Sequence, residues 1–150
     1  MTNYDSLTKI IEEYKKAMLT EDKDLSGVSA DLNALTEAIT FDKDADAMWT
    51  ESAKSLLNAM IYYLLEACFI TGTLDELSIH TVKRFFIEHC ETFTDGSGKQ
   101  TSKLDELFKS LPAGHLAKTA YAPLSFYIGD TRSSIFATLS HKLDLSTEAL

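Results

Sequence analysis

The segment from Met48 to Thr73, MWTESAKSLLNAMIYYLLEACFITGT, restricts the fold of this chain more than any other feature. A membrane-spanning helix needs about 20 largely apolar residues, and a carboxylate near its centre costs several kcal/mol. Here the uncharged run extends only from Ser55 to Leu65 and is followed by Glu66. The segment is therefore expected to form the long central helix of a helical bundle, with no membrane contact.

The polar residues of this expected helix recur at intervals of three or four, so they form one narrow line along it. They are Glu51, Ser55, Asn58, Tyr62 and Glu66. Apolar residues occupy most of the remaining circumference, and the polar line is expected to be the one open strip. It can face solvent, a neighbouring helix or a partner. Glu66 has apolar neighbours in the sequence, so its carboxylate must reach water or pair with a cation, for which Lys83 and Arg84 are candidates.

Helical periodicity and capping residues place the other elements. A period of 3.6 predicts a first helix over about residues 4–19 and helices around residues 104–111 and 116–127, while no segment shows the period of two typical of strands. Candidate N-caps are Asp31, Asp44 or Asp46, Ser78, and Asp130 or Thr131. Gly72, Pro112 and Gly129 are expected to end helices, and Pro123 is expected to kink one. The sequence thus predicts an all-α fold, a compact bundle of about seven helices around one long central helix, in a single domain over residues 1–150.

The charge balance points to a protein partner of opposite sign. Twenty-three acidic and fourteen basic residues give a net charge of -9, which repels phosphate backbones and anionic lipids. Direct nucleic-acid binding is therefore not expected, and a basic protein is the more natural partner. The acidic excess is concentrated between Glu21 and Asp46. A solvated acidic surface is the simpler explanation of this segment. If the chain instead uses its acids to bind a partner, the candidate residues are Asp22, Asp24, Asp42 and Asp44, together with Glu51 and Glu66 of the expected central helix.

No residue pattern supports catalysis or metal binding. The segment DGSGKQTS, residues 95–102, lacks the first glycine and the Ser or Thr after lysine that a phosphate-binding loop requires. The four histidines and two cysteines show no metal-ligand spacing, and there is no Gly-x-Ser-x-Gly nucleophile motif. We expect no catalytic residue, no cofactor and no enzymatic activity. With no signal-peptide pattern and only Cys68 and Cys90, a reducing cytoplasmic location is expected.

Two stretches resemble a known family. AMWTESAKSLLNAMIYYLLE, Ala47 to Glu66, is similar to a stretch of TraG-like type IV secretion coupling proteins, and YIGDTRSSIFATLSHKLDL, Tyr127 to Leu145, is similar to a later stretch of the same family. The order and separation of the two stretches are also similar. The resemblance implies the all-alpha domain of such a protein, a helical bundle inserted in a RecA-like nucleotide-binding domain on the cytoplasmic side of the membrane. The ATPase residues of the family lie outside this domain, so none is carried over.

Three functions follow as hypotheses. The resemblance implies a substrate-recognition domain of a conjugative coupling protein, which would bind relaxase or relaxosome accessory proteins and contact the remaining domains of the ATPase. The alternative is a stand-alone acidic helical adaptor or regulator. An all-α enzyme that uses Glu66 is the weakest hypothesis. The reading frame on either side of the chain distinguishes the first two, because a coupling protein needs a phosphate-loop strand and an acidic magnesium-binding strand.

Overall fold

The computed structural model describes residues 3–127 and 129–148, and these residues form an all-α bundle. The α-helices are α1 (Asn3–Met18), α2 (Ser26–Thr40), α3 (Ala47–Thr71), α4 (Ile79–His89), α5 (Lys103–Lys109), α6 (Leu116–Tyr121) and α7 (Gly129–Glu148). Two short 3-10 helices, η1 (Leu74–Glu76) and η2 (Ala122–Phe126), and two strands, β1 (Thr92–Thr94) and β2 (Gln100–Ser102), complete the described part. The predicted fold class is confirmed.

The central helix α3 begins and ends where its local sequence predicts. Of the two candidate caps, Asp46 is the N-cap, and its carboxylate accepts a hydrogen bond of 2.8 Å from the N–H of Met48. At the other end Gly72 has a φ of 74°, in the left-handed region that glycine adopts without strain. The N–H of Thr73 then reaches back to the Cys68 carbonyl at 2.8 Å, which satisfies one of the last free carbonyls of the helix.

Two predicted helix boundaries are wrong. Helix α2 begins at Ser26, five residues before Asp31, because the Asp24 carboxylate accepts from the N–H of Ser26 and Val28 adds a buried side chain one turn earlier. Gly129 does not end a helix but begins α7, so Asp130 lies inside the first turn. The predicted kink at Pro123 takes the form of a change from α-helix to 3-10 helix at Ala122.

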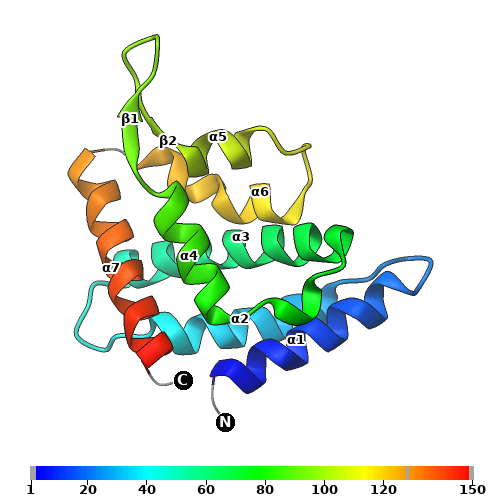
Figure 1. Cartoon of the computed structure of the whole chain (residues 1–150). Helices are drawn as coiled ribbons and strands as arrows, with labels where there is room; N and C mark the ends of the chain where they lie inside the picture. Colours follow the sequence, from blue (N-terminus) through cyan, green and yellow to red (C-terminus); the bar gives the residue numbers. More distant parts are fainter. Residues whose placement is uncertain (1–2, 128, 149–150) are drawn as a thin grey trace.

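A small β-hairpin was not predicted. Strands β1 and β2 pair antiparallel with Phe93 opposite Thr101, and Figure 1 shows the hairpin projecting from the bundle. Its loop is organised by Asp95, whose carboxylate accepts hydrogen bonds from the backbone N–H of Ser97 at 2.9 Å and of Lys99 at 3.0 Å. Strands of three residues are too short to show a period of two, so the sequence pattern did not reveal them.

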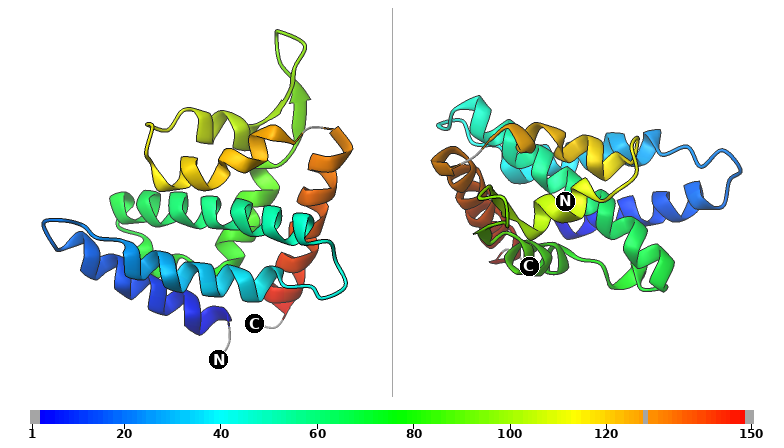
Figure 2. Two further views of the ribbon diagram at one scale, coloured as in Figure 1. Left: turned by 180° about the vertical axis from the view of Figure 1, so that it is seen from behind. Right: turned by 90° about the horizontal axis from the view of Figure 1, so that it is seen from above.

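Helix α3 lies at the centre of the molecule. It contacts α2, α4, α6 and α7 as well as both 3-10 helices. In Figure 1 α2 and α6 run along opposite sides of α3, and α7 crosses the set at a steep angle; the rear view in Figure 2 shows the same arrangement. Helix α1 packs on α2, at the outer side of the bundle.

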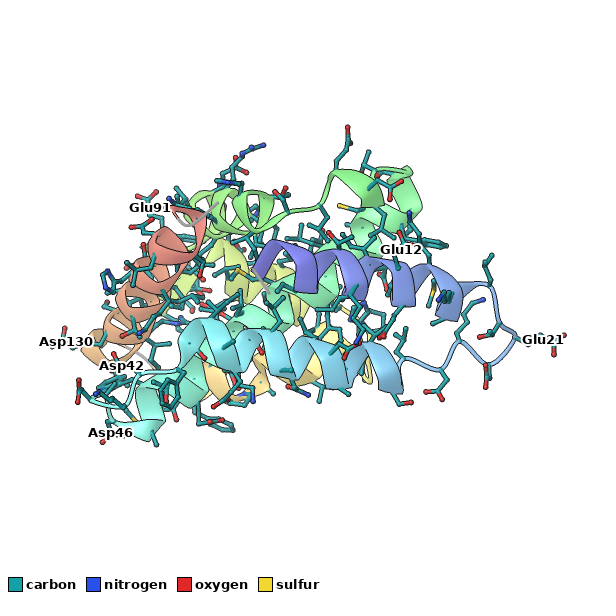
Figure 3. The ribbon with its side chains drawn as sticks, turned by 90° about the horizontal axis from the view of Figure 1, so that it is seen from below. Glu12, Glu21, Asp42, Asp46, Glu91 and Asp130 are labelled. Carbon is teal, nitrogen blue, oxygen red and sulfur yellow. The ribbon has the colours of Figure 1, made fainter. Side chains whose placement is uncertain are left out.

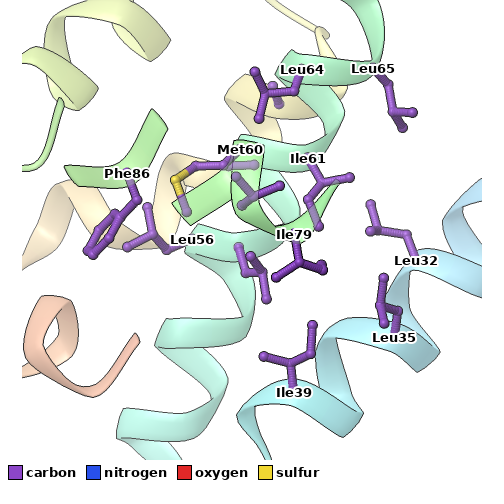
Figure 4. Close-up of a cluster of buried hydrophobic side chains, with 14 of the residues drawn as sticks. Leu32, Leu35, Ile39, Leu56, Met60, Ile61, Leu64, Leu65, Ile79 and Phe86 are labelled. Carbon is purple, nitrogen blue, oxygen red and sulfur yellow. The ribbon is translucent and has the colours of Figure 1, made fainter. Parts of the chain in front are cut away.

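The core is one continuous cluster built around α3. Figure 4 shows Leu56, Met60 and Ile61 of α3 beside side chains from α2 and α4. By length and composition α3 would also suit a membrane span, but nine of its residues are buried in the bundle, including all three of these. Each large aliphatic side chain removed from water contributes roughly 1.5–3 kcal/mol. The hydrophobicity of α3 is thus accounted for by core packing.

Candidate functional site

The middle of the polar line of α3, at Asn58 and Tyr62, faces a neighbouring helix. Asn58 accepts a hydrogen bond of 2.7 Å from the buried hydroxyl of Thr36, and its amide donates to Asn33 at 3.1 Å. One turn further, the Tyr62 hydroxyl donates to the Ser29 hydroxyl at 2.7 Å. All three partners lie on α2. The expectation of an open strip is therefore wrong for the middle of the line, which holds α2 against α3.

Glu66 pairs with His115 and not with either of the cations expected for it. Its Oε2 lies 2.9 Å from Nε2 of His115, while Lys83 pairs with Asp144 on α7 instead. His115 is the N-cap of α6, and its Nδ1 accepts from the N–H of Ala117 at 3.1 Å. Because Nδ1 is an acceptor there, Nε2 carries the ring proton and donates a hydrogen bond to the Glu66 carboxylate. The pair connects the C-terminal half of α3 to the start of α6.

Glu51, the first member of the line, is exposed near the start of α3. Among the described residues it makes no hydrogen bond or ion pair. Of the two glutamates proposed for partner binding, Glu51 has a free carboxylate and Glu66 is already engaged within the bundle.

The four candidate aspartates lie in two loops and divide into two kinds. Asp24 accepts from the N–H of Ser26 at 2.9 Å, and Asp42 accepts from the N–H of Asp44 at 3.0 Å and pairs with Lys142 of α7 at 3.4 Å. The hydrogen bonds from Ser26 lower the pKa of Asp24, and the N–H of Asp44 together with Lys142 lowers that of Asp42. The carboxylates of Asp22 and Asp44 are exposed and make no such contact within the described part of the chain.

These two loops lie at opposite ends of α2, so they do not form one patch. Figure 3 shows Glu21 in the first loop at one end of the molecule, and Asp42 and Asp46 of the second loop at the other. The 15 residues of α2 separate them, a length of about 22 Å at 1.5 Å per residue. The sequence places all of these acids within one short segment, whereas the fold places them on two separate surfaces.

A cavity of about 700 Å³, which the sequence did not predict, lies between the hairpin, α5, α6 and η2. Arg132 of α7 also lines it. Arg132 is 3% exposed, and its Nη2 donates to the carboxylate of Asp105 and, at 3.1 Å, to the hydroxyl of Tyr121. Tyr121 itself donates to Asp105 at 2.6 Å. Ser102 donates to the second carboxylate oxygen of Asp105 at 3.1 Å.

The electrostatics of this network favour a charged Asp105 and a neutral Tyr121. Burial of Asp105 works against its charged form, but the hydrogen bonds from Arg132 and Tyr121 outweigh burial and lower the pKa of Asp105. Burial raises the pKa of Tyr121, and the neighbouring Asp105 charge raises it further. The Nε–H of Arg132 is buried and has no hydrogen-bond acceptor among the described residues.

Residues 3–127 and 129–148 bring together no group of three His, Cys, Asp or Glu side chains suited to a metal ion. Cys68 and Cys90 are free and half-buried against the core, where burial raises the pKa of the Cys90 thiol. Comparison with known proteins finds no matching family model, no similar curated protein and no similar solved structure. The resemblance to coupling proteins therefore rests on the two sequence stretches alone.

Proposed function

We propose that this chain is a docking module for a basic protein partner. The observation that carries the proposal is the pair of acidic loops at the two ends of α2, each with an exposed aspartate, Asp22 or Asp44, that has no structural role among the described contacts. In a chain of net charge -9 such loops attract a basic surface and steer its approach. The carboxylates of Asp24 and Asp42 stabilise the same loops by accepting hydrogen bonds from backbone N–H groups.

We further propose that the partner is a relaxase or a relaxosome accessory protein and that the parent protein is a conjugative coupling ATPase. This identification rests on the two family-like stretches. They form most of α3 and α7, and these two helices pack against each other. In addition, the start of α1 and the end of α7 lie close together in the views of Figures 1 and 2, which is the geometry that insertion into another domain requires.

The test is a binding measurement with the purified chain and the relaxase and accessory proteins encoded near its gene, at about 50 and 300 mM salt. We expect binding at low salt that weakens at high salt, and a slower association for the Asp22→Asn/Asp44→Asn variant. The matched control is Glu88→Gln, which removes one exposed charge from α4. Absence of binding at both salt concentrations would refute a relaxase or an accessory protein as the partner.

The coupling-protein part has a separate test. The reading frame around this chain should contain a phosphate-loop strand on one side and an acidic magnesium-binding strand on the other. A frame without either, combined with salt-dependent binding of some other basic protein, would leave the docking module standing as an independent adaptor.

A further inference from the structure

The cavity between the hairpin, α5, α6 and η2 differs in charge from the rest of the molecule. The segment from Thr92 to Tyr127 contains four lysines and three acidic residues, whereas the whole chain has 14 basic and 23 acidic residues. Three of those lysines, Lys99, Lys109 and Lys118, line the cavity. Asp95, Asp105 and Glu106 line it as well, so with Arg132 the lining carries four cationic and three acidic side chains, in contrast to the net charge of -9 of the whole chain.

The buried Arg132 also lines the cavity and has one N–H donor without an acceptor among the described residues. Its Nη2 donates to Asp105 and Tyr121, while the donor without an acceptor is the buried Nε–H. A buried donor without an acceptor is destabilising. Buried polar groups in folded proteins are nearly always satisfied, by protein, water or ligand. Arg132 lines the cavity, so an anionic group bound there would lie near its guanidinium.

The cavity also offers an apolar wall. The rings of Phe108 and Tyr121, both lining residues and only 1% and 4% exposed, stack with their centroids 4.5 Å apart, and the exposed Ala122 also lines the cavity. Lys118 is already engaged, because its Nζ donates to the carbonyls of Lys109 at 3.2 Å and Leu111 at 2.9 Å. Lys99 and the side chain of Lys109 are therefore the cations available to a ligand.

We propose that this cavity binds a small organic anion, in which a phosphate or carboxylate group meets Lys99, Lys109 and Arg132 and a flat apolar body lies against Phe108, Tyr121 and Ala122. The volume of about 700 Å³ is in the range of small-molecule sites. No residue of the two acidic loops lines this cavity, so ligand binding here and docking of a protein partner are tested separately.

The experiment is an NMR titration of the ¹⁵N-labelled chain with phenyl phosphate as the probe. Benzoate is the carboxylate arm, inorganic phosphate supplies the anion alone, and benzyl alcohol supplies the aromatic body alone. We expect saturable shifts confined to residues lining the cavity. Phenyl phosphate or benzoate should bind at least about tenfold more tightly than either fragment, a ratio that corresponds to 1.4 kcal/mol. The tighter of the two identifies the anionic group.

Surface variants connect the shifts to the site without disturbing the buried network. Lys99→Gln/Lys109→Gln should weaken the tighter probe about tenfold, and Ala122→Leu should block it by filling the cavity. Lys103→Gln, which removes a lysine of α5 that does not line the cavity, should bind as the unmodified chain does. No saturable shift at millimolar probe, shifts that map elsewhere, or undiminished binding by both cavity variants would overturn the proposal.

Discussion

At the scale of single residues, the structure replaces expected contacts by specific polar pairs between distant parts of the chain. Glu66 meets His115 rather than Lys83 or Arg84. Arg132 crosses from α7 to Asp105 on α5, 27 residues away in the sequence. Both pairs connect elements that the hydrophobic pattern places in the bundle but does not orient. Their energetic consequences differ with burial, because a buried charge that loses its partner costs far more than an exposed one.

The buried pair gives the largest predicted effect of a polar substitution. Asp105→Asn keeps the shape of the side chain but leaves the Arg132 guanidinium without a counter-charge, and the expected loss is about 3 kcal/mol in the free energy of unfolding, measured by urea denaturation at pH 7. Because the folded-state pKa of Asp105 is lowered, its contribution is present above the unfolded pKa of about 3.9 and is lost as the pH falls through the folded value.

The control for this prediction is Glu106→Gln on the same helix, an exposed neighbour whose charge has no buried partner. We expect a change within about 0.5 kcal/mol. Equal effects of the two substitutions would show that Asp105 and Arg132 do not form a stabilising pair.

Glu13 has the opposite pH behaviour. Hydrogen bonding with the Asp31 carboxyl, burial and the Asp31 charge all raise the pKa of Glu13, and its Oε2 is buried without a hydrogen-bond partner in the described part of the chain. Since a raised carboxyl pKa favours the protonated form in the folded state, stability is lost as the pH rises through that pKa. Glu13→Gln should therefore add about 0.5 kcal/mol at pH 7.

Thermal unfolding of the Glu13→Gln protein at two pH values tests this sign. The stabilisation should raise the Tm by about 1–2 °C at pH 7 and disappear near pH 4, where Glu13 of the unmodified chain is protonated. Glu12→Gln, one position earlier and exposed, is the control. A gain that persists unchanged at pH 4 would contradict the assigned pKa shift.

At the scale of elements, α3 and the strand β1 differ strongly in burial. Helix α3 is surrounded by other elements and supplies nine buried residues, whereas β1 is exposed throughout its length. Local opening should follow this difference, since segments with few buried apolar contacts open most readily.

Leu56 lies fully buried at the centre of the core (Figure 4). Leu56→Ala should destabilise the chain by about 3 kcal/mol, through lost burial and the cavity left behind. Ile70→Ala near the end of the same helix, where the side chain is 74% exposed, should change the free energy of unfolding by less than about 1 kcal/mol. Similar losses in urea denaturation would mean that α3 is not the centre of the core.

The turn of the hairpin is held by hydrogen bonds to one carboxylate, that of Asp95. Asp95→Ala removes the acceptor that organises the turn, so we expect faster amide hydrogen exchange over residues 92–102 and almost no change in global stability. Asp130→Ala, an exposed aspartate in the first turn of α7, should leave exchange in the hairpin unchanged. A cooperative loss of the whole fold in Asp95→Ala would show that the hairpin is part of the core.

At the scale of the whole molecule, the separation of the two acidic loops determines how they can act. With α2 between them, a partner contacts both only if its surface spans that length, and each loop otherwise acts alone. Sites more than 7–10 Å apart with no shared partner usually contribute additively.

Asp22→Asn and Asp44→Asn should therefore slow association with the basic partner by independent factors, and their product should equal the effect of the double variant. Stopped-flow association at low salt measures all three rates. An effect of the double variant that departs from this product would indicate that the two loops bind one shared patch of the partner.

The sequence by itself determined the all-α class, the central helix with its start at Asp44 or Asp46 and its end at Gly72, and the start of α4 at Ser78. These features depend on hydrogen bonds and side-chain spacings within a few residues, which the local sequence contains. The hairpin was not predicted from the sequence, because its strands are only three residues long.

Only the tertiary structure decided that the polar line of α3 faces α2, that Glu66 meets His115, and that the cavity forms around Arg132. It also decided that the acidic loops lie apart. In each case the outcome depends on how helices far apart in the sequence pack against one another, because the hydrophobic effect that drives this packing is non-directional and leaves the polar partners to the final geometry.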